Sequence, residues 1–246
     1  QMTNKYMYFI ANWKMFGGFN SLNSINKVIK FLKSFQKNKK IKVIYCPPST
    51  LIRPMSEKLK GNTIEVGAQN CHQNQNYGPF TGSVNPMMLK SVGAKYVIIG
   101  HSENRQEGET DKLINIKIKC ALKSGLKVIF CIGETLKEKK TKKTKQILNR
   151  QIRTGLDKIK SKHNIIIAYE PVWSIGSGLI PKSKELLETI NFIRKKTRNC
   201  KILYGGSVNP KNISKLNTMS NVDGYMIGGA SQDPKKLIDI IIKTYN

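Results

Sequence analysis

The apolar residues of this 246-residue chain gather into eight short runs spread along its whole length. Between most of these runs the apolar residues recur with a period near 3.6, as at Leu22, Ile25, Val28, Ile29 and Leu32, which is typical of a helix with one buried face. The pattern therefore predicts an α/β fold in which eight parallel strands close into a (β/α)8 barrel, with residues 1–246 as a single domain. The predicted strands are residues 6–10, 41–46, 64–68, 96–99, 127–132, 165–169, 202–204 and 224–227.

The charge balance is extreme, because 43 Lys and Arg residues face 15 Asp and Glu residues and give a formal net charge of +28. Such a charge would suit a polyanion partner. The lysines, however, are spread over nearly every predicted helix, and aromatic residues do not interleave with them as a base-stacking surface requires. The densest run, residues 137–145, is typical of a solvated helix face. Specific nucleic-acid binding is not expected, and a compositional bias toward Lys, Asn and Ile is the alternative explanation of the charge.

The apolar stretches and the cysteines of the sequence indicate where the protein is located and whether it binds a metal. No apolar stretch is long enough to span a membrane, and the first residues lack the apolar core and cleavage site of a secretory signal, so we expect a cytoplasmic protein. The cysteines are odd in number and show no metal-ligand spacing, which predicts reduced, mostly buried thiols and no metal site. They are Cys46, Cys71, Cys120, Cys131 and Cys200.

The sixth apolar run and the segment after it are the most informative part of the chain. Residues 165–169 end in Glu170, and Pro171 cannot extend a strand ladder, so the carboxylate is expected at the rim of the barrel. Residues 172–181, here called the lid, combine large apolar residues with Gly-Ser-Gly at 176–178, whose backbone N–H groups can point at an anion. This composition predicts a segment that closes over a small polar ligand and excludes water. A carboxylate after a strand is more commonly a solvated cap, so the other strand ends must decide.

Polar side chains follow two other predicted strands. Asn12 and Lys14 share a side of the extended chain, so an amide and an ammonium can point together into the barrel mouth. His101 and Glu103 follow the fourth strand, where a helix is predicted to begin. A histidine at a strand end is more often structural, but the positive end of this helix disfavours protonation and would leave a neutral ring able to donate a hydrogen bond.

Small residues follow the last two predicted strands. The glycine pairs 205–206 and 228–229, together with Ser207, leave backbone N–H groups open to a phosphate. Barrels of this class often bind phosphate after strands 7 and 8. With Gly176 in the lid, these positions predict a phosphate site at the same end of the barrel as Glu170.

These motifs resemble one known family. The sequence Tyr-Glu-Pro-Val-Trp-Ser-Ile-Gly-Ser-Gly at 169–178 resembles the catalytic strand and mobile lid of triosephosphate isomerase, and Asn-Trp-Lys-Met at 12–15 and Gly-His-Ser-Glu at 100–103 resemble its other site motifs. The resemblance covers about residues 8–231. It implies the TIM barrel fold and the interconversion of dihydroxyacetone phosphate and D-glyceraldehyde 3-phosphate through an enediolate, a step of glycolysis and gluconeogenesis, with no metal or organic cofactor.

The resemblance also implies a role for each site residue. Glu170 would move the proton, His101 would donate to the carbonyl oxygens, and Lys14 and Asn12 would bind substrate and stabilise the enediolate. Glu103 would orient the site, and Glu134 would help to position the lid. Phosphate would be bound by Gly176, Ser207, Gly228 and Gly229.

The long 69–85 loop, uncommon in a compact domain unless functional, carries the main departure from the family pattern. In the family this loop projects into a neighbouring subunit, so the resemblance implies a homodimer in which Thr81 reaches the partner's active site. Ser83 stands where the family has glutamate, and Asn104 stands where it has the arginine that pairs with that glutamate. Because both charges are missing together, neither is left buried and unpaired.

A second departure lies at the far end of the lid. In many family members a tyrosine hydroxyl, matched here by Tyr204, bonds a backbone N–H at the position that Pro181 occupies in this chain. Proline has no N–H, so that bond cannot form. The Ser207 hydroxyl is expected to accept from the Gly178 N–H instead when the lid closes.

Two other function classes fit part of the pattern. Another phosphate-binding barrel enzyme would share the glycines after strands 7 and 8 but would not need Glu170, His101 and Lys14 together. A basic polyanion-binding protein built on an inactive barrel would bind its ligand without turnover. Formation of the aldose from dihydroxyacetone phosphate discriminates among the three.

Overall fold

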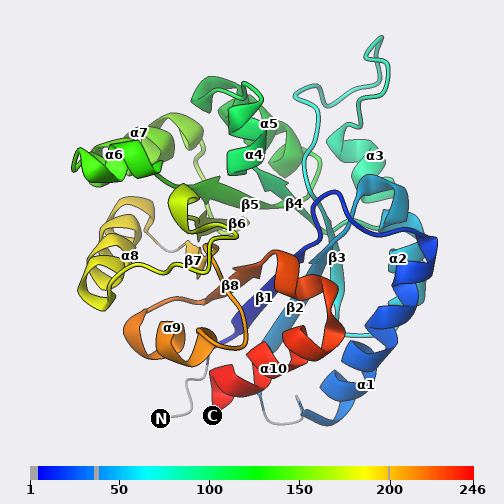
Figure 1. Ribbon diagram of the computed structural model, residues 1–246. Helices are drawn as coiled ribbons and strands as arrows, with labels where there is room; N and C mark the ends of the chain where they lie inside the picture. The colour runs from blue at the N-terminus through cyan, green and yellow to red at the C-terminus, as the bar shows by residue number, and fades with distance from the viewer. Residues whose placement is uncertain (1–4, 36–38, 199) are drawn as a thin grey trace.

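Eight parallel strands pair in chain order and close into a barrel in the computed structural model, which describes residues 5–35, 39–198 and 200–246 (Figure 1). The last strand pairs with the first, with Tyr8 opposite Gly224 and Ala11 opposite Ile227. The barrel predicted from the sequence is confirmed. Its strands are β1 (Met7–Asn12), β2 (Ile41–Cys46), β3 (Glu65–Ala68), β4 (Tyr96–Ile99), β5 (Lys127–Ile132), β6 (Ile165–Tyr169), β7 (Lys201–Tyr204) and β8 (Gly224–Ile227).

Helices surround the ring of strands (Figure 1). Their starts follow local rules: the Thr110 hydroxyl accepts the Leu113 N–H at the start of α5, and Asp233 followed by Pro234 begins α10. The α-helices are α1 (Ile25–Phe35), α2 (Ile52–Lys58), α3 (Pro86–Ser91), α4 (Ser102–Gln106), α5 (Asp111–Lys123), α6 (Leu136–Lys140), α7 (Thr144–Gly155), α8 (Ser183–Thr197), α9 (Ile213–Met219) and α10 (Pro234–Tyr245). Short 3-10 helices are η1 (Phe19–Ser24), η2 (Ser49–Leu51), η3 (Val172–Ser174) and η4 (Gly229–Gln232).

The strands are apolar on both faces because each face is buried in a different layer. Ile10 and Ile98 belong to a cluster inside the barrel, whereas Phe9 and Val97 belong to the larger cluster between the strands and the helices. Fully burying one such side chain stabilises the fold by about 1.5 to 3 kcal/mol. The double burial explains why the strands appear in the sequence as unbroken apolar runs.

The predicted strand ends differ from the observed ones mainly at β1. The apolar run predicted an end at Ile10, but the strand continues to Asn12 because Ala11 and Asn12 still pair with Tyr45 and Cys46 of β2. Strand pairing, and not hydropathy alone, therefore decides where β1 delivers its polar residue. None of the helices in the described residues is long and apolar enough to cross a membrane.

The cysteines agree with the sequence-based expectation. All five are free thiols, and Cys120 is the one among them that is partly exposed. Burial raises the pKa of Cys71 to about 12 and that of Cys200 to about 11, so both stay protonated near neutral pH.

Candidate active site

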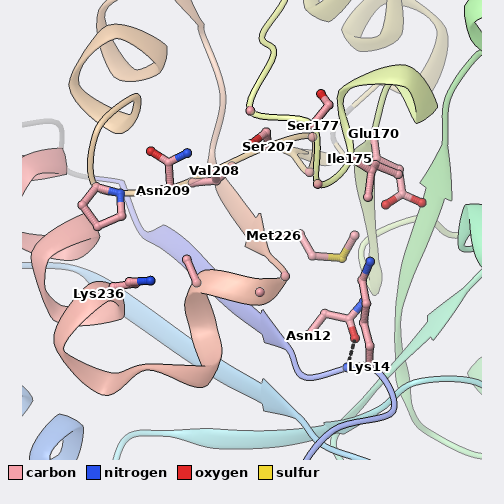
Figure 2. Close-up of a pocket in the computed structure, with 18 of the residues that line it drawn as sticks. Asn12, Lys14, Glu170, Ile175, Ser177, Ser207, Val208, Asn209, Met226 and Lys236 are labelled. Carbon is pink, nitrogen blue, oxygen red and sulfur yellow. Dashed lines mark hydrogen bonds between the residues drawn. The ribbon is translucent and has the colours of Figure 1, made fainter.

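A cavity of about 630 Å³ lies beyond the C-terminal ends of the strands (Figure 2). Residues that follow five different strands line it, so segments far apart in sequence meet at one place. Of the predicted site residues, the lining includes Asn12, Lys14, His101, Glu170, Gly176, Ser207, Gly228 and Gly229. Glu103 is not among the lining residues, but its side chain contacts Lys14 and His101.

Glu170 comes directly after β6 and is 2% exposed. One carboxylate oxygen accepts the Ser102 N–H at 3.1 Å, and the other lies 3.2 Å from His101 Nε2. The backbone around it is tightly held, because the Glu170 N–H donates to the Ile132 carbonyl and a Cβ at Gly133 would overlap the Glu170 carbonyl oxygen. Glycine is therefore required at position 133, because the chain there passes so close to the Glu170 backbone.

His101 precedes α4 and connects the two carboxylates of the site. Its Nδ1 accepts the Glu103 N–H at 3.2 Å, so in this hydrogen-bond pattern the ring proton is assigned to Nε2, which faces Glu170. Burial lowers the pKa of His101, but the Glu170 carboxylate, with a smaller contribution from Glu103, outweighs burial and raises the pKa above its usual 6.5.

The direction of this shift is opposite to the one predicted from the sequence. The sequence pointed to the start of a helix, which disfavours protonation, but α4 has only five residues and gives His101 Nδ1 one N–H. Two carboxylates within 3.6 Å of the ring act more strongly in the other direction.

Lys14 reaches the cavity by a turn that the sequence did not predict. Its φ is +54°, in the left-handed region, so Asn12 and Lys14 do not share one side of an extended strand as the period of two suggested. The turn is held because the Asn12 side-chain oxygen accepts the Lys14 N–H at 3.0 Å (Figure 2). The Lys14 ammonium lies 2.7 Å from a Glu103 oxygen, and the Gln69 side chain donates to the Lys14 carbonyl at 2.8 Å.

Gln69 is a positioning residue that the sequence reasoning missed. Its amide nitrogen bonds both the Lys14 and the Cys46 carbonyls and so ties the end of β3 to the turn that carries Lys14. Its position, directly after an apolar strand, was the available signal. Asn209 and Lys236 also line the cavity without having been predicted (Figure 2). Lys211 is a further lining residue that was not predicted.

Glu134 anchors the base of the lid. It is 1% exposed, and it accepts hydrogen bonds from the Tyr169 hydroxyl at 3.1 Å and from Trp173 Nε1 at 3.3 Å. Its backbone carbonyl also accepts the Val172 N–H. Burial raises the pKa of Glu134, and these donors oppose the shift. The Lys139 ammonium lies over the Trp173 ring, 3.7 Å from its centroid, so the apolar base of the lid is covered from outside as well.

The far end of the lid departs from the sequence-based expectation. Pro181 has no N–H to offer the Tyr204 hydroxyl, and this hydroxyl lies 2.9 Å from the Ser174 hydroxyl instead. The Ser207 N–H donates to the same Ser174 oxygen at 3.1 Å. The hydrogen bond between the Gly178 N–H and the Ser207 hydroxyl is expected in the closed lid, and it stays a prediction for that state.

The phosphate side of the cavity is built from backbone. A Cβ at Gly228 would lie 3.7 Å from Lys14 Cε, and one at Gly229 would meet nothing within 4 Å. A side chain would fit at either position without a clash. The absence of one instead leaves the backbone at Gly228 and Gly229 accessible from the cavity. Among the described residues, no group of three or more His, Cys, Asp or Glu side chains is placed to hold a metal ion.

The comparisons with known proteins agree with this geometry. Residues 7–244 match the family described as triosephosphate isomerase. The triosephosphate isomerase of Thermodesulfovibrio yellowstonii is 40% identical over 243 residues, which cover 95% of this chain and 98% of that protein, and the one of Dictyoglomus thermophilum is 38% identical over 243 residues, covering 94% and 96%. The crystal structure of triosephosphate isomerase from Bartonella henselae superposes with a TM-score of 0.88 at 34% identity and covers 98% of this chain and 99% of that one. The chain therefore belongs to the triosephosphate isomerase family.

Proposed function

We propose that this chain interconverts dihydroxyacetone phosphate and D-glyceraldehyde 3-phosphate, the reaction of the family to which it belongs, in glycolysis and gluconeogenesis. The observation that carries the proposal is the meeting of a buried carboxylate and an imidazole, with Glu170 3.2 Å from His101 Nε2, in a cavity that Lys14 and backbone glycines also line. A carboxylate base opposite a hydrogen-bond donor is what proton transfer next to a carbonyl requires.

Glu170 is the proposed base. It takes a proton from the carbon next to the substrate carbonyl and returns it to the former carbonyl carbon, while the hydroxyl proton passes from one substrate oxygen to the other, so the reaction neither gains nor loses protons. Its present partners, the Ser102 N–H and His101 Nε2, hold the carboxylate before substrate arrives. Substrate must displace the contact with His101, because the same Nε2–H is needed on the reacting oxygen.

His101, Lys14 and Asn12 stabilise the charge that develops on the substrate oxygens. His101 donates from Nε2, since its Nδ1 already accepts the Glu103 N–H. The Lys14 ammonium supplies a full positive charge, and Asn12 supports it through the turn between them. Glu103 acts as a positioning residue, because it contacts both the Lys14 ammonium and the imidazole.

Phosphate is bound by backbone N–H groups of Gly176, Ser207, Gly228 and Gly229, which line the other side of the cavity. Because the phosphate does not react, its binding free energy is available to close the lid over the reacting carbons. Closure excludes water and protects the enediolate from losing phosphate. No step of this mechanism uses a metal ion or an organic cofactor.

The activity test compares two histidines. His101→Gln should lower kcat by about 100-fold or more, because it removes the donor aimed at the carbonyl oxygens. The exposed His163, away from the cavity, provides the matched control, and His163→Gln should keep full activity. Rates are measured in both directions with a coupled dehydrogenase. A wild-type chain that binds phosphate but does not turn over would favour the inactive-barrel alternative.

A homodimer is proposed from exposed apolar side chains in the two segments that follow β1 and β3. In the 69–85 loop, which extends from the barrel between β3 and α3, Tyr77 is 74% exposed and Phe80 is 42% exposed (Figure 1). In the segment after β1, Met15 is 92% exposed and Phe16 is 64% exposed. Apolar surface of this kind marks an interaction site. We propose that the loop of one subunit covers the partner, with Thr81 reaching the partner's active site.

The dimer is tested by placing a charge on this surface. Phe80→Asp should shift the protein to a monomer in sedimentation velocity and lower its activity, because a buried unpaired carboxylate opposes association. Leu136 in α6 is similarly exposed, at 47%, and Leu136→Asp should leave the dimer intact. A Phe80→Asp protein that remains dimeric at micromolar concentration would contradict the proposed interface.

We further propose that the chain works in the cytoplasm as a single barrel domain. The location is supported by the glycolytic reaction of the family, and the domain assignment is supported by the closure of all eight strands into one sheet.

A further inference from the structure

Ser174, the last residue of η3, is completely buried at the base of the lid. Its hydroxyl contacts three polar groups, one within the lid and two in the segment at the end of β7. It lies 2.5 Å from the Leu179 carbonyl oxygen, 2.9 Å from the Tyr204 hydroxyl and 3.1 Å from the Ser207 nitrogen. None of the predicted roles in the site included this residue.

The direction of each hydrogen bond follows from the capacity of a hydroxyl, which has one hydrogen to donate and two lone pairs to accept with. The Leu179 carbonyl can only accept, so the Ser174 hydrogen goes there. The Tyr204 hydroxyl must then donate to Ser174, and the Ser207 N–H donates to the remaining lone pair. The Ser174 hydroxyl is therefore fully used, and it cannot gain a partner without losing one.

Two of these contacts, those with Tyr204 and Ser207, join the lid to the end of β7 and the loop after it. Residues 174–179, here called the lid unit, are joined by their own hydrogen bonds. The Ser177 hydroxyl donates to the Ser174 carbonyl at 3.0 Å and accepts the Leu179 N–H at 3.1 Å. Tyr204 ends β7, and Ser207 lies three residues later, at the cavity. Ser174 is thus the place where the lid unit is attached to the segment that is proposed to bind phosphate.

Gly206 shows how closely these groups approach each other. A Cβ at this position would overlap the Tyr204 hydroxyl and lie 2.6 Å from the Ser174 hydroxyl oxygen. Only glycine leaves room for the lid and the β7 loop to meet in this way. The contact is therefore supported by two separate features of the chain, the hydroxyl at 174 and the missing side chain at 206.

We propose that Ser174 is a positioning residue that competes with phosphate for the Ser207 N–H. Phosphate needs this N–H, and one N–H cannot make two full hydrogen bonds, so phosphate must take it from Ser174. The exchange leaves a lone pair of Ser174 free and removes one of the two contacts that hold the lid unit to the β7 segment. Arrival of phosphate thereby loosens the lid from its position in the unliganded protein, which frees it to close over the substrate. This inference rests on the proposed function, which places the phosphate at Ser207.

The test measures the dissociation constant of inorganic phosphate by NMR titration of the full-length protein. Ser174→Ala removes the competitor, so phosphate should bind about 2- to 10-fold more tightly than to the wild type. Ser177→Ala is the matched control, because it also loosens the lid unit but leaves the Ser174–Ser207 contact in place. It should not tighten phosphate binding. Equal or weaker binding by Ser174→Ala, or equal tightening by Ser177→Ala, overturns the competition.

A second variant protects the test against loss of folding. Ser174→Ala leaves the buried Tyr204 hydroxyl without its partner, whereas the double variant with Tyr204→Phe removes both polar groups, and it should show the same tightening. Failure of the inference and failure of the proposed function give different results. If the wild type does not bind phosphate at all, the proposed phosphate site is wrong and the competition falls with it. If the wild type binds phosphate and the substitutions at Ser174 change nothing, only the competition is wrong.

Discussion

Shortening Glu170 to aspartate tests the proposed base without removing its charge. The substitution retracts the carboxylate by one C–C bond, about 1.5 Å. The Glu170 backbone has little room to move and compensate. It lies so close to Gly133 that a Cβ at that position would overlap the Glu170 carbonyl oxygen, and its N–H donates to the Ile132 carbonyl. A carboxylate oxygen now 3.2 Å from His101 Nε2 would therefore lose its reach into the reacting centre.

The expected loss follows from the size of this displacement. A misplacement of about 1 Å costs about 100-fold in rate, so Glu170→Asp should lower kcat by about 100- to 1,000-fold, equivalent to about 3 to 4 kcal/mol in the activation barrier. KM should change much less, because the groups proposed to bind phosphate, such as Gly228 and Ser207, are not altered.

The assay follows aldose formation from dihydroxyacetone phosphate and the reverse reaction through coupled dehydrogenases, and it reports kcat and KM separately. The melting temperature and the inhibition constant of inorganic phosphate check that the fold and the phosphate side are intact. Glu107→Asp provides the control for the same chemical change at an exposed carboxylate outside the cavity. A Glu170→Asp protein with the melting temperature of the wild type and a kcat within tenfold of it would refute Glu170 as the base.

Three further predictions address charge and the lid. The pKa of His101 should lie above its usual 6.5, because the two carboxylates favour the protonated ring. NMR titration measures this pKa, Glu103→Gln should lower it, and a midpoint below 6.5 would contradict the effect of the two carboxylates. With a non-competing salt, kcat/KM should fall as ionic strength rises while kcat changes less. The reason is that the Debye length shrinks to about 10 Å at 0.1 M, so salt screens the attraction between the +28 charge and the anionic substrate. A salt-independent kcat/KM would mean that the charge does not steer the substrate. Tyr204→Phe should lower kcat less than Ser207→Ala, because Pro181 has no N–H for the Tyr204 hydroxyl in the closed lid, whereas the Ser207 hydroxyl is expected to accept the Gly178 N–H there, a bond worth about 0.5 to 1.5 kcal/mol or several-fold in rate. Steady-state kinetics of the two variants measures both losses, and a loss for Tyr204→Phe as large as that for Ser207→Ala would contradict this prediction.

The sequence by itself determined the barrel and the positions of most site residues. Strands buried on both faces appear as apolar runs such as 165–169, and counting these runs led to the closed barrel. Because parallel strands deliver their C-terminal ends to one rim, the sequence predicts that the residues after them lie in one cavity. Glu170, His101 and Ser207 are all there.

Only the tertiary structure decided how these residues contact each other. The pKa direction of His101 depends on two carboxylates that approach it through space, and Lys14 reaches the cavity through a left-handed turn held by Asn12 and Gln69. The partner of the Tyr204 hydroxyl also lay outside the reach of sequence reasoning, which followed the missing N–H of Pro181 and not a hydroxyl 30 residues away. Periodicity and strand ends describe where a backbone goes, whereas side-chain hydrogen bonds and charge interactions depend on distances between segments that only the closed barrel sets.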